Sequence, residues 1–201
     1  MLVGAKYKIC KRLGASVFEK CQTQKYQLAE TRAPRRMSRR GGSSFGLQLL
    51  EKQKARFTYG LSEAQFSRYV HEAMARHGVS AMTGLVTKLE SRLDNVIYRA
   101  GLTKTRRAAR QLVSHGHVTV GGKRMSIPSY QVSVGDAVGI REGSRTSPLF
   151  ANRAEAMLEQ KAPTWMKIGS DGLTLEILNE PTVPEAELSW SPAVIVQFYS
   201  R

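Results

Sequence analysis

Acidic side chains, cysteines and long apolar runs are all scarce in this sequence of 201 residues. The longest apolar run near the C-terminus, Ala193 to Val196, is far too short to cross a bilayer, so no membrane partner is expected. Cys10 and Cys21 are the only cysteines, and no secretory signal follows the start of the chain. The simplest interpretation is a reducing, intracellular compartment.

The sequence also lacks the motifs of common enzyme classes. It contains neither a G-x-x-x-x-G-K-[ST] loop nor a G-x-G-x-x-G fingerprint. The string from His71 to His77 superficially resembles a zinc-protease motif. However, the position four residues after His71 is Ala75, and His77 falls nearly on the opposite side of a helix. We therefore expect no enzyme activity, no cofactor and no small-molecule substrate.

A structural metal site is not expected either. Such a zinc site usually needs four Cys or His ligands with short spacings, and Cys10 and Cys21 have no such companions nearby. His115 and His117 flank a single glycine and fit RNA contact or hairpin packing better than metal binding.

Positive charge is what the sequence has in excess. Its 31 Lys and Arg against 16 Asp and Glu give a net charge of +15. Residues 1–60 contribute +11 and residues 61–150 contribute +7, whereas residues 151–201 carry −3. Charge of this size opposes compaction unless a polyanion neutralises it. The uneven distribution disfavours a merely basic protein and predicts an anion-binding surface in the first three quarters of the chain.

The first helices are expected after a stretch rich in arginine, glycine and serine, residues 35–44. This stretch has too few apolar residues to order itself, which predicts an arm that folds on RNA, with a flexible charged linker as the alternative. Periodicity then predicts a helix over Phe45–Lys54. A second helix is expected to begin at the capping box of Ser62 and Gln65 and to end at Gly78.

The clearest helical phase runs over Leu89–Ala100. At about 100° per residue, its apolar side chains fall within one narrow stripe, and Arg92, Asn95 and Arg99 lie on another face. The pattern therefore predicts one continuous helix with a packing face and a separate polar face. Gly101 is expected to end it.

The following helix carries the strongest functional signal. Thr103 or Thr105 is expected to cap it, one side is expected to pack, and the other presents Arg106, Arg107 and Arg110. The planar guanidinium group matches phosphate oxygens two at a time. The alternative is a solvated charged face. RNA is favoured over DNA because no helix-turn-helix or dimer signature accompanies these residues, and a small mixed module fits structured RNA.

Strands are expected beyond this helix. Val118–Val120 alternates as a strand, and Gly121-Gly122 is typical of a two-residue hairpin turn. The other expected elements are strands at Val132–Val134 and Ala137–Ile140, a helix at Asn152–Gln160, and a final β-prone run at Val194–Tyr199.

Several of these segments resemble the family of bacterial-type ribosomal protein S4. The resemblance to its RNA-binding module lies in residues 89–99, 109–117, 127–130 and 134–136. The resemblance to its helical domain lies in residues 49–54 and 59–60, and that to its closing segment in residues 163–165 and 198–201. It covers nearly the whole chain. It begins by about Lys6, so no transit peptide is expected, which favours the bacterial cytoplasm over an imported organellar protein. An organelle-encoded protein is the alternative.

The resemblance implies an α+β fold. A mostly helical N-terminal domain with a basic arm would be joined to an inserted α/β RNA-binding module of two helices and a short twisted antiparallel sheet. The expected boundaries are residues 1–45 for the arm, 46–90 for the helical domain, 91–151 for the module, and 152–201 for a C-terminal helix and tail that complete the helical domain.

The resemblance also implies a function. A member of this family would be a structural constituent of the small ribosomal subunit that binds the 5′ domain of 16S rRNA, nucleates assembly of the subunit body and contributes to accuracy. Its expected partners include ribosomal protein S5, other small-subunit proteins, and mRNA near the channel by which it enters. The alternatives are an RNA-modifying enzyme or a stand-alone RNA-binding factor with the same module. Residues 1–88 and 152–201 are too short to supply a catalytic domain, and stand-alone factors lack the helical domain.

Basic and polar side chains at matching positions are the implied RNA-binding residues. They are Lys6, Lys8, Lys11, Arg12, Arg39, Arg40, Lys52, Lys54, Arg56, Arg92, Asn95, Arg99, Lys104, Arg106, Arg107, Arg110, Gln111, His115, His117, Lys123 and Arg124.

Two departures from the family pattern concern the arm. Cys10 resembles the first ligand of a zinc knuckle found in some members, but Leu13 stands where the second would be. The usual turn of the arm is replaced by residues 39–42.

Overall fold

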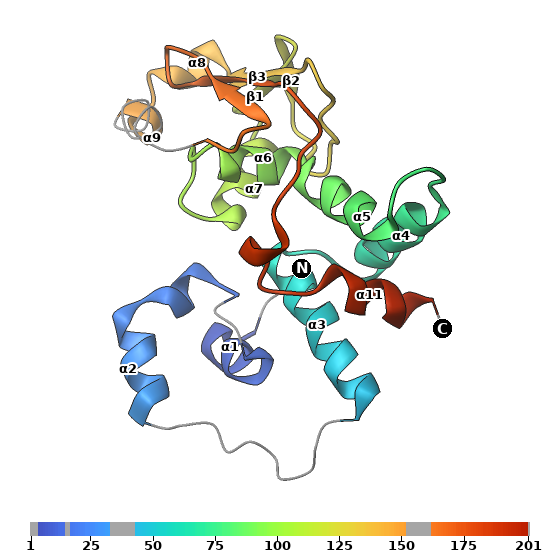
Figure 1. Cartoon of the computed structure of the whole chain (residues 1–201). Coiled ribbons are helices and arrows are strands. Elements are labelled where there is room, and N and C mark those ends of the chain that lie inside the picture. Colours follow the sequence, from blue (N-terminus) through green and yellow to red (C-terminus); the bar gives the residue numbers. More distant parts are fainter. Residues whose placement is uncertain (1–3, 15–16, 33–42, 152–161, 201) are drawn as a thin grey trace. The chain divides into compact units, whose positions relative to one another are not determined.

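The computed structural model describes residues 4–14, 17–32, 43–151 and 162–200. The chain divides into two units, one formed by Met1–Leu85 with Val183–Arg201 and the other by Val86–Thr182 (Figure 1). Most of the expected arginine-rich arm and the expected helix at Asn152–Gln160 lie outside the described residues. No helix in the described part of the chain is long and apolar enough to span a membrane.

The first unit is helical. Its main elements are α3 (Ser44–Thr58), α4 (Glu63–Ala75) and the beginning of α5 (Ala81–Glu90). The backbone N–H of Gln65 donates to the Ser62 hydroxyl, so the predicted cap of α4 is confirmed, although α4 ends at Ala75, before Gly78. The predicted helix over Phe45–Lys54 is likewise confirmed as part of α3.

The end of the chain is helical and was wrongly expected to favour a strand. Helix α11 spans Pro192–Tyr199 and packs on α3 and α4 within this unit. Proline at its first position fixes a backbone angle that suits a helix start, and Ile195 is fully buried. Tertiary packing therefore overrides the β-propensity of Val194, Ile195 and Val196.

The N-terminal part of the first unit has a small core of its own. Helices α1 (Lys6–Leu13) and α2 (Gln24–Arg32) and the short 3-10 helix η1 (Glu19–Gln22) enclose buried side chains that include Phe18 and Tyr26, and Phe57 of α3 packs against them. A disulfide between Cys10 and Cys21 joins α1 to η1. Neither these helices nor the disulfide was expected from the sequence, which predicted its first helix at Phe45 and whose two cysteines were interpreted as those of a reducing compartment.

The second unit is a small sheet with helices packed against it. Its helices α6 (Leu93–Arg99) and α7 (Arg106–Ser114) lie together on one face of the sheet (Figure 1). The strands follow the order β2-β1-β3-β5-β4, and every neighbouring pair is antiparallel. They are β1 (Val118–Val120), β2 (Lys123–Met125), β3 (Ala137–Ile140), β4 (Met166–Ile168) and β5 (Thr174–Ile177). This unit also has the short helices α8 (Glu142–Arg145) and α9 (Pro148–Ala151). A further short helix, η2 (Glu185–Glu187), belongs to the first unit. This mixed architecture confirms the α+β prediction.

The core of the second unit draws on both ends of its sequence. Val96 and Ile97 of α6 and Val113 of α7 pack with the inner side chains of β1 and β3. Trp165 and Leu175 complete the same core, and β5 pairs with β3. Residues 163–182 therefore belong to this unit, although they were expected to complete the helical domain.

The expected helix over Leu89–Ala100 is wrong in one respect, because it is broken at Arg92. The backbone of Arg92 is extended, with φ −64° and ψ 135°. Leu93 N–H donates to the Tyr130 carbonyl, and Val132 N–H donates to the Ser91 carbonyl. These bonds form a single antiparallel bridge across the break between α5 and α6. The expected strand at Val132–Val134 does not continue from it, because the chain turns at once: Ser133 N–H donates to the Asp136 carboxylate, and Asp136 N–H donates to the Ser133 carbonyl.

Candidate nucleic-acid interface

Helix α7 is held in a fixed orientation by its cap and its apolar side. The Ala108 N–H donates to the Thr105 hydroxyl at 3.1 Å, which confirms Thr105 as the cap. Ala109 and Val113 are fully buried in the core of the second unit. The opposite side of the helix must therefore face outward.

The outward side carries a row of exposed polar residues. Arg107, Gln111 and His115 follow one another at intervals of four, so they lie above one another along the helix, and Lys104 precedes them. We call these four residues the α7 stripe. Among the described residues, neither Lys104 nor Arg107 forms an ion pair. The stripe therefore presents cations that are available to an external anion.

The other two arginines of α7 are turned toward α6. The Arg106 Nε donates to Asn95 Oδ1 at 2.8 Å, and its guanidinium lies 4.3 Å from the centre of the Tyr98 ring. Arg110 is half-buried. Burial raises the pKa of the nearby Asp94 carboxyl, and the charge of Arg110 is one of the influences that oppose this rise. Of the three guanidinium groups expected on one face, the structure places only that of Arg107 fully outside.

Arg92 is completely buried. Its guanidinium donates twice to the Asp94 carboxylate, at 2.6 Å and 3.0 Å. Burial raises the pKa of the Asp94 carboxyl above its ordinary value, and the charge and hydrogen bond of Arg92 oppose that rise. This pair stands at the break between α5 and α6, where it holds the local backbone and has no exposed surface for a ligand.

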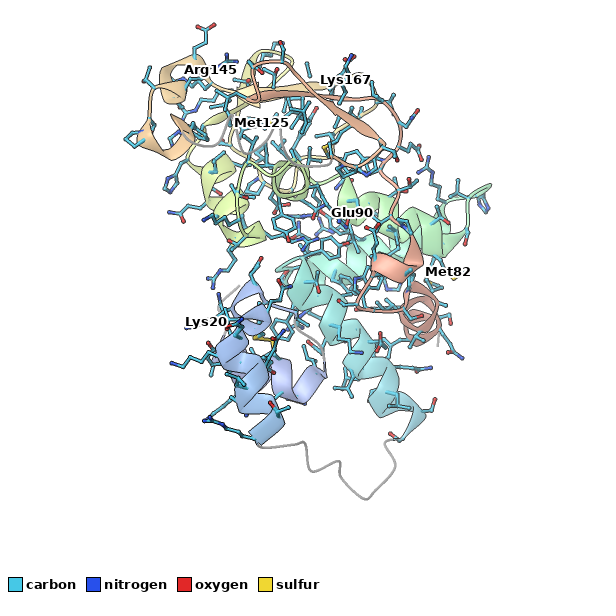
Figure 2. All side chains as sticks on the ribbon, turned by 60° about the vertical axis from the view of Figure 1, so that its left-hand side comes forward. Lys20, Met82, Glu90, Met125, Arg145 and Lys167 are labelled. Atoms are coloured by element: carbon cyan, nitrogen blue, oxygen red, sulfur yellow. A yellow bond between two sulfur atoms is a disulfide. The ribbon has the colours of Figure 1, made fainter. Side chains whose placement is uncertain are left out.

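A second buried network joins three helices through Glu90. The Glu90 side chain has no exposed surface, and it accepts hydrogen bonds from Asn95 at 2.8 Å and from Arg99 at 2.8 Å and 3.1 Å. Asn95 in turn accepts from Arg106. Figure 2 shows Glu90 among the helices, whereas Lys167 lies on strand β4 of the sheet in the same unit. Glu90 and Asp94 were not among the residues expected from the sequence, although two acids among so many cations were a signal of internal pairing.

The β1–β2 hairpin extends the polar surface next to α7. Lys123 and Arg124 are exposed, and Arg124 Nη2 donates to the His115 carbonyl at 3.3 Å. His117 behaves differently. Its Nδ1 lies 3.0 Å from the Ser144 hydroxyl and its ring packs against Phe150, so it helps to join α7, β1 and the α8–α9 segment.

In the first unit, the expected RNA-binding residues of α3 instead form contacts within the protein. Lys52 is buried, pairs with Glu63 at 2.7 Å and lies over the Phe198 ring. Arg56 pairs with the same carboxylate at 2.8 Å, and Tyr199 donates its hydroxyl to it. We call these five residues the Glu63 cluster.

The remaining cation of α3, Lys54, pairs with Glu51. Glu51 also accepts a hydrogen bond from the backbone N–H of Ser191, just before α11. The cations of α3 therefore lie close to the contacts that hold the end of the chain on α3 and α4.

Among the expected RNA-binding residues of the first unit that the structure describes, the exposed ones lie on helix α1. Lys8, Lys11 and Arg12 are exposed, and Lys6 is half-buried with its ammonium over the Phe18 ring. Arg39 and Arg40 lie outside the described residues. In the part of the chain that the structure describes, no three His, Cys, Asp or Glu side chains are grouped to hold a metal ion.

Comparison with known proteins identifies the family of this chain. The Ribosomal protein S4/S9 N-terminal domain matches residues 1–90, and the S4 domain matches residues 91–138. The chain belongs to the uS4 family. The resemblance seen in the sequence is thereby confirmed.

Individual members of the family match over most of their length. The "Small ribosomal subunit protein uS4" of Roseiflexus castenholzii is 42% identical over 203 residues, with 99% of this chain and 98% of that protein covered. The protein of the same name from Acetivibrio thermocellus is 40% identical over 204 residues, with 98% of each covered. That of Corynebacterium kroppenstedtii is 48% identical over 159 residues, or 79% of each chain.

Proposed function

We propose that the chain is a structural constituent of the small ribosomal subunit in the bacterial cytoplasm and that it binds 16S rRNA. The observation that carries this proposal is the match to small-subunit proteins over almost the entire length of both partners. The net charge of +15 is consistent with it, because a folded chain of this charge is stabilised by a polyanion. An RNA-modifying enzyme is not favoured, since the matched relatives leave no part of the chain for a catalytic domain.

The finer expectations belong to the same proposal. The chain would bind the 5′ domain of 16S rRNA early, nucleate assembly of the subunit body and contribute to accuracy of translation. It would contact ribosomal protein S5 and other small-subunit proteins, and it would lie near mRNA at the mRNA entry channel. These statements rest on membership of the family, and the exposed cations of α1 and α7 are consistent with binding to RNA.

Sedimentation of a cell lysate through a sucrose gradient tests the proposal. We expect the protein to migrate with the small subunit at low salt and to leave it only at high salt. A protein found solely at the top of the gradient, at every salt concentration, would contradict this function.

Within the second unit, we propose that the α7 stripe binds the RNA backbone. Arg107→Ala should weaken binding to a 5′-domain transcript and reduce the slope of log K against log salt by about 0.7 to 0.9, because one phosphate contact is lost. Lys167→Ala is the matched control, since Lys167 is exposed on the face of the sheet away from α6 and α7. Equal slopes for the wild type and both variants would show that Arg107 does not contact the RNA backbone.

A further inference from the structure

Gly116 lies at the corner where α7 ends and β1 is about to begin. It is buried, its φ is +74°, and its N–H donates to the Val113 carbonyl at 2.8 Å. A left-handed conformation of this kind favours glycine. The turn alone does not distinguish Gly116, because Gly121 and Gly122 of the hairpin also have positive φ.

The space beside Gly116 does distinguish it. A Cβ atom at this position would overlap the guanidinium of Arg124, at Nε, Nη2 and Cζ. At Gly122, with a nearly equal φ of +77°, a Cβ would meet nothing within 4 Å. The space that a side chain at position 116 would occupy is thus filled by the guanidinium of Arg124.

That arginine comes from the neighbouring strand and ends beside the α7 stripe. Arg124 of β2 pairs in register with Thr119 of β1, and its side chain reaches back across the corner to donate to the His115 carbonyl. Carbonyls at the end of a helix lack partners within the helix and carry partial negative charge, which favours a cation there. The bond uses one of the five N–H groups of the guanidinium.

We propose that Gly116 is a positioning residue for RNA binding. By having no side chain it lets Arg124 lie flat across the corner, which adds the arginine of the hairpin to the end of the α7 stripe. Helix and hairpin then form one site for successive phosphates of an RNA backbone. The inference rests on the proposed binding of RNA by the α7 stripe.

A double-mutant cycle in the full-length chain tests the inference with a 5′-domain transcript of 16S rRNA as the probe. Arg124→Ala should weaken binding roughly tenfold and lower the salt slope by about 0.7 to 0.9. Gly116→Ala should cause most of the same loss and the same change of slope, because it displaces the guanidinium. The double variant should bind no more weakly than Arg124→Ala. Gly122→Ala, which introduces similar backbone strain in open space, should keep the wild-type slope.

Thermal unfolding shows whether Gly116→Ala remains folded. It should melt close to Gly122→Ala, because the overlapping atoms are the far end of an exposed side chain that can move aside. The inference is overturned if the two substitutions reduce affinity independently, or if folded Gly116→Ala binds with the wild-type affinity and salt slope. A wild-type chain that does not bind the transcript would instead contradict the proposed function itself.

Discussion

Arg92, at the extended break before α6, and Arg107, on α7, have completely different surroundings. Arg92 has no exposed surface and is bound to Asp94 by two hydrogen bonds. Arg107 is exposed and forms no ion pair among the described residues. A buried guanidinium holds the fold, and an exposed one is available to a phosphate. Residue type and helical phase do not separate the two, because both lie on polar faces of the sequence pattern.

Replacing Arg92 should therefore affect stability and leave the salt dependence of RNA binding unchanged. Arg92→Ala leaves the Asp94 carboxylate buried without its partner, which costs about 3 to 5 kcal/mol in such sites. Urea unfolding monitored by circular dichroism measures the loss. Arg92→Ala combined with Asp94→Ala should recover part of it, since no uncompensated charge remains. A folded Arg92→Ala variant with wild-type stability but a reduced salt slope would show that this guanidinium contacts RNA.

At the scale of elements, one shared carboxylate links the C-terminal helix to both α3 and α4. Glu63 of α4 accepts hydrogen bonds from Lys52 and Arg56 of α3 and from Tyr199 of α11. Partial burial raises the pKa of the Glu63 carboxyl, but the three hydrogen bonds outweigh it and lower the pKa below the ordinary value of 4.5. Burial, together with the hydrogen bond to Glu63, raises the pKa of the Tyr199 phenol. The charged form of Glu63 is thus the one that joins α11 to its neighbours.

This predicts a loss of stability in acid. Because the folded-state pKa of Glu63 is lowered, its contribution is fully present above about pH 4.5 and is lost as the pH falls through the folded value. Glu63→Gln should reduce stability at pH 7 by less than about 1 kcal/mol per ion pair, since the side chain is partly exposed. The free energy of unfolding of this variant should change less between pH 5 and pH 3 than that of the wild type. Glu176→Gln, on an exposed position of the other unit, should leave the wild-type pH dependence in place.

Local sequence signals predicted the elements that short-range physics controls. The caps at Ser62 and Thr105 and the Gly121-Gly122 turn depend on neighbouring residues, and the structure has them all. The break at Arg92 depends on hydrogen bonds from residues 130–132, far along the chain, and no local pattern reveals it. Likewise, the helical form of Val194–Tyr199 depends on packing against α3 and α4.

The candidate site follows the same rule. Helical phase and charge predicted that one side of α7 faces outward and that Arg107 lies on it. The inward positions of Arg106 and Asn95 could not, because they depend on the buried Glu90 and the Tyr98 ring. The position of Arg124 across Gly116 depends on the pairing of two strands with the end of a helix.

At the scale of the whole molecule, the division into two units decides which segments are needed for a stable RNA-binding module. The sheet continues past β3 through β5 to β4, and Trp165, Met166, Leu175 and Ile177 belong to the core under it. Full burial of each such side chain contributes about 1.5 to 3 kcal/mol. Their sum is comparable with the total stability of a small domain, which is about 5 to 15 kcal/mol. A module without these strands would lose the hydrophobic contacts that hold β3.

Two fragments test where the module ends. Residues 81–182 retain α5 and the complete sheet, so this fragment should fold and unfold cooperatively in urea. Residues 91–151 lack β4 and β5 and should remain largely unfolded, with poor dispersion of amide resonances in NMR spectra. The longer fragment should also retain the dependence of RNA binding on Arg107, because the α7 stripe lies within the second unit. A stably folded 91–151 fragment would show that the core of the module closes without β4 and β5, and that the boundary expected from the sequence is sufficient.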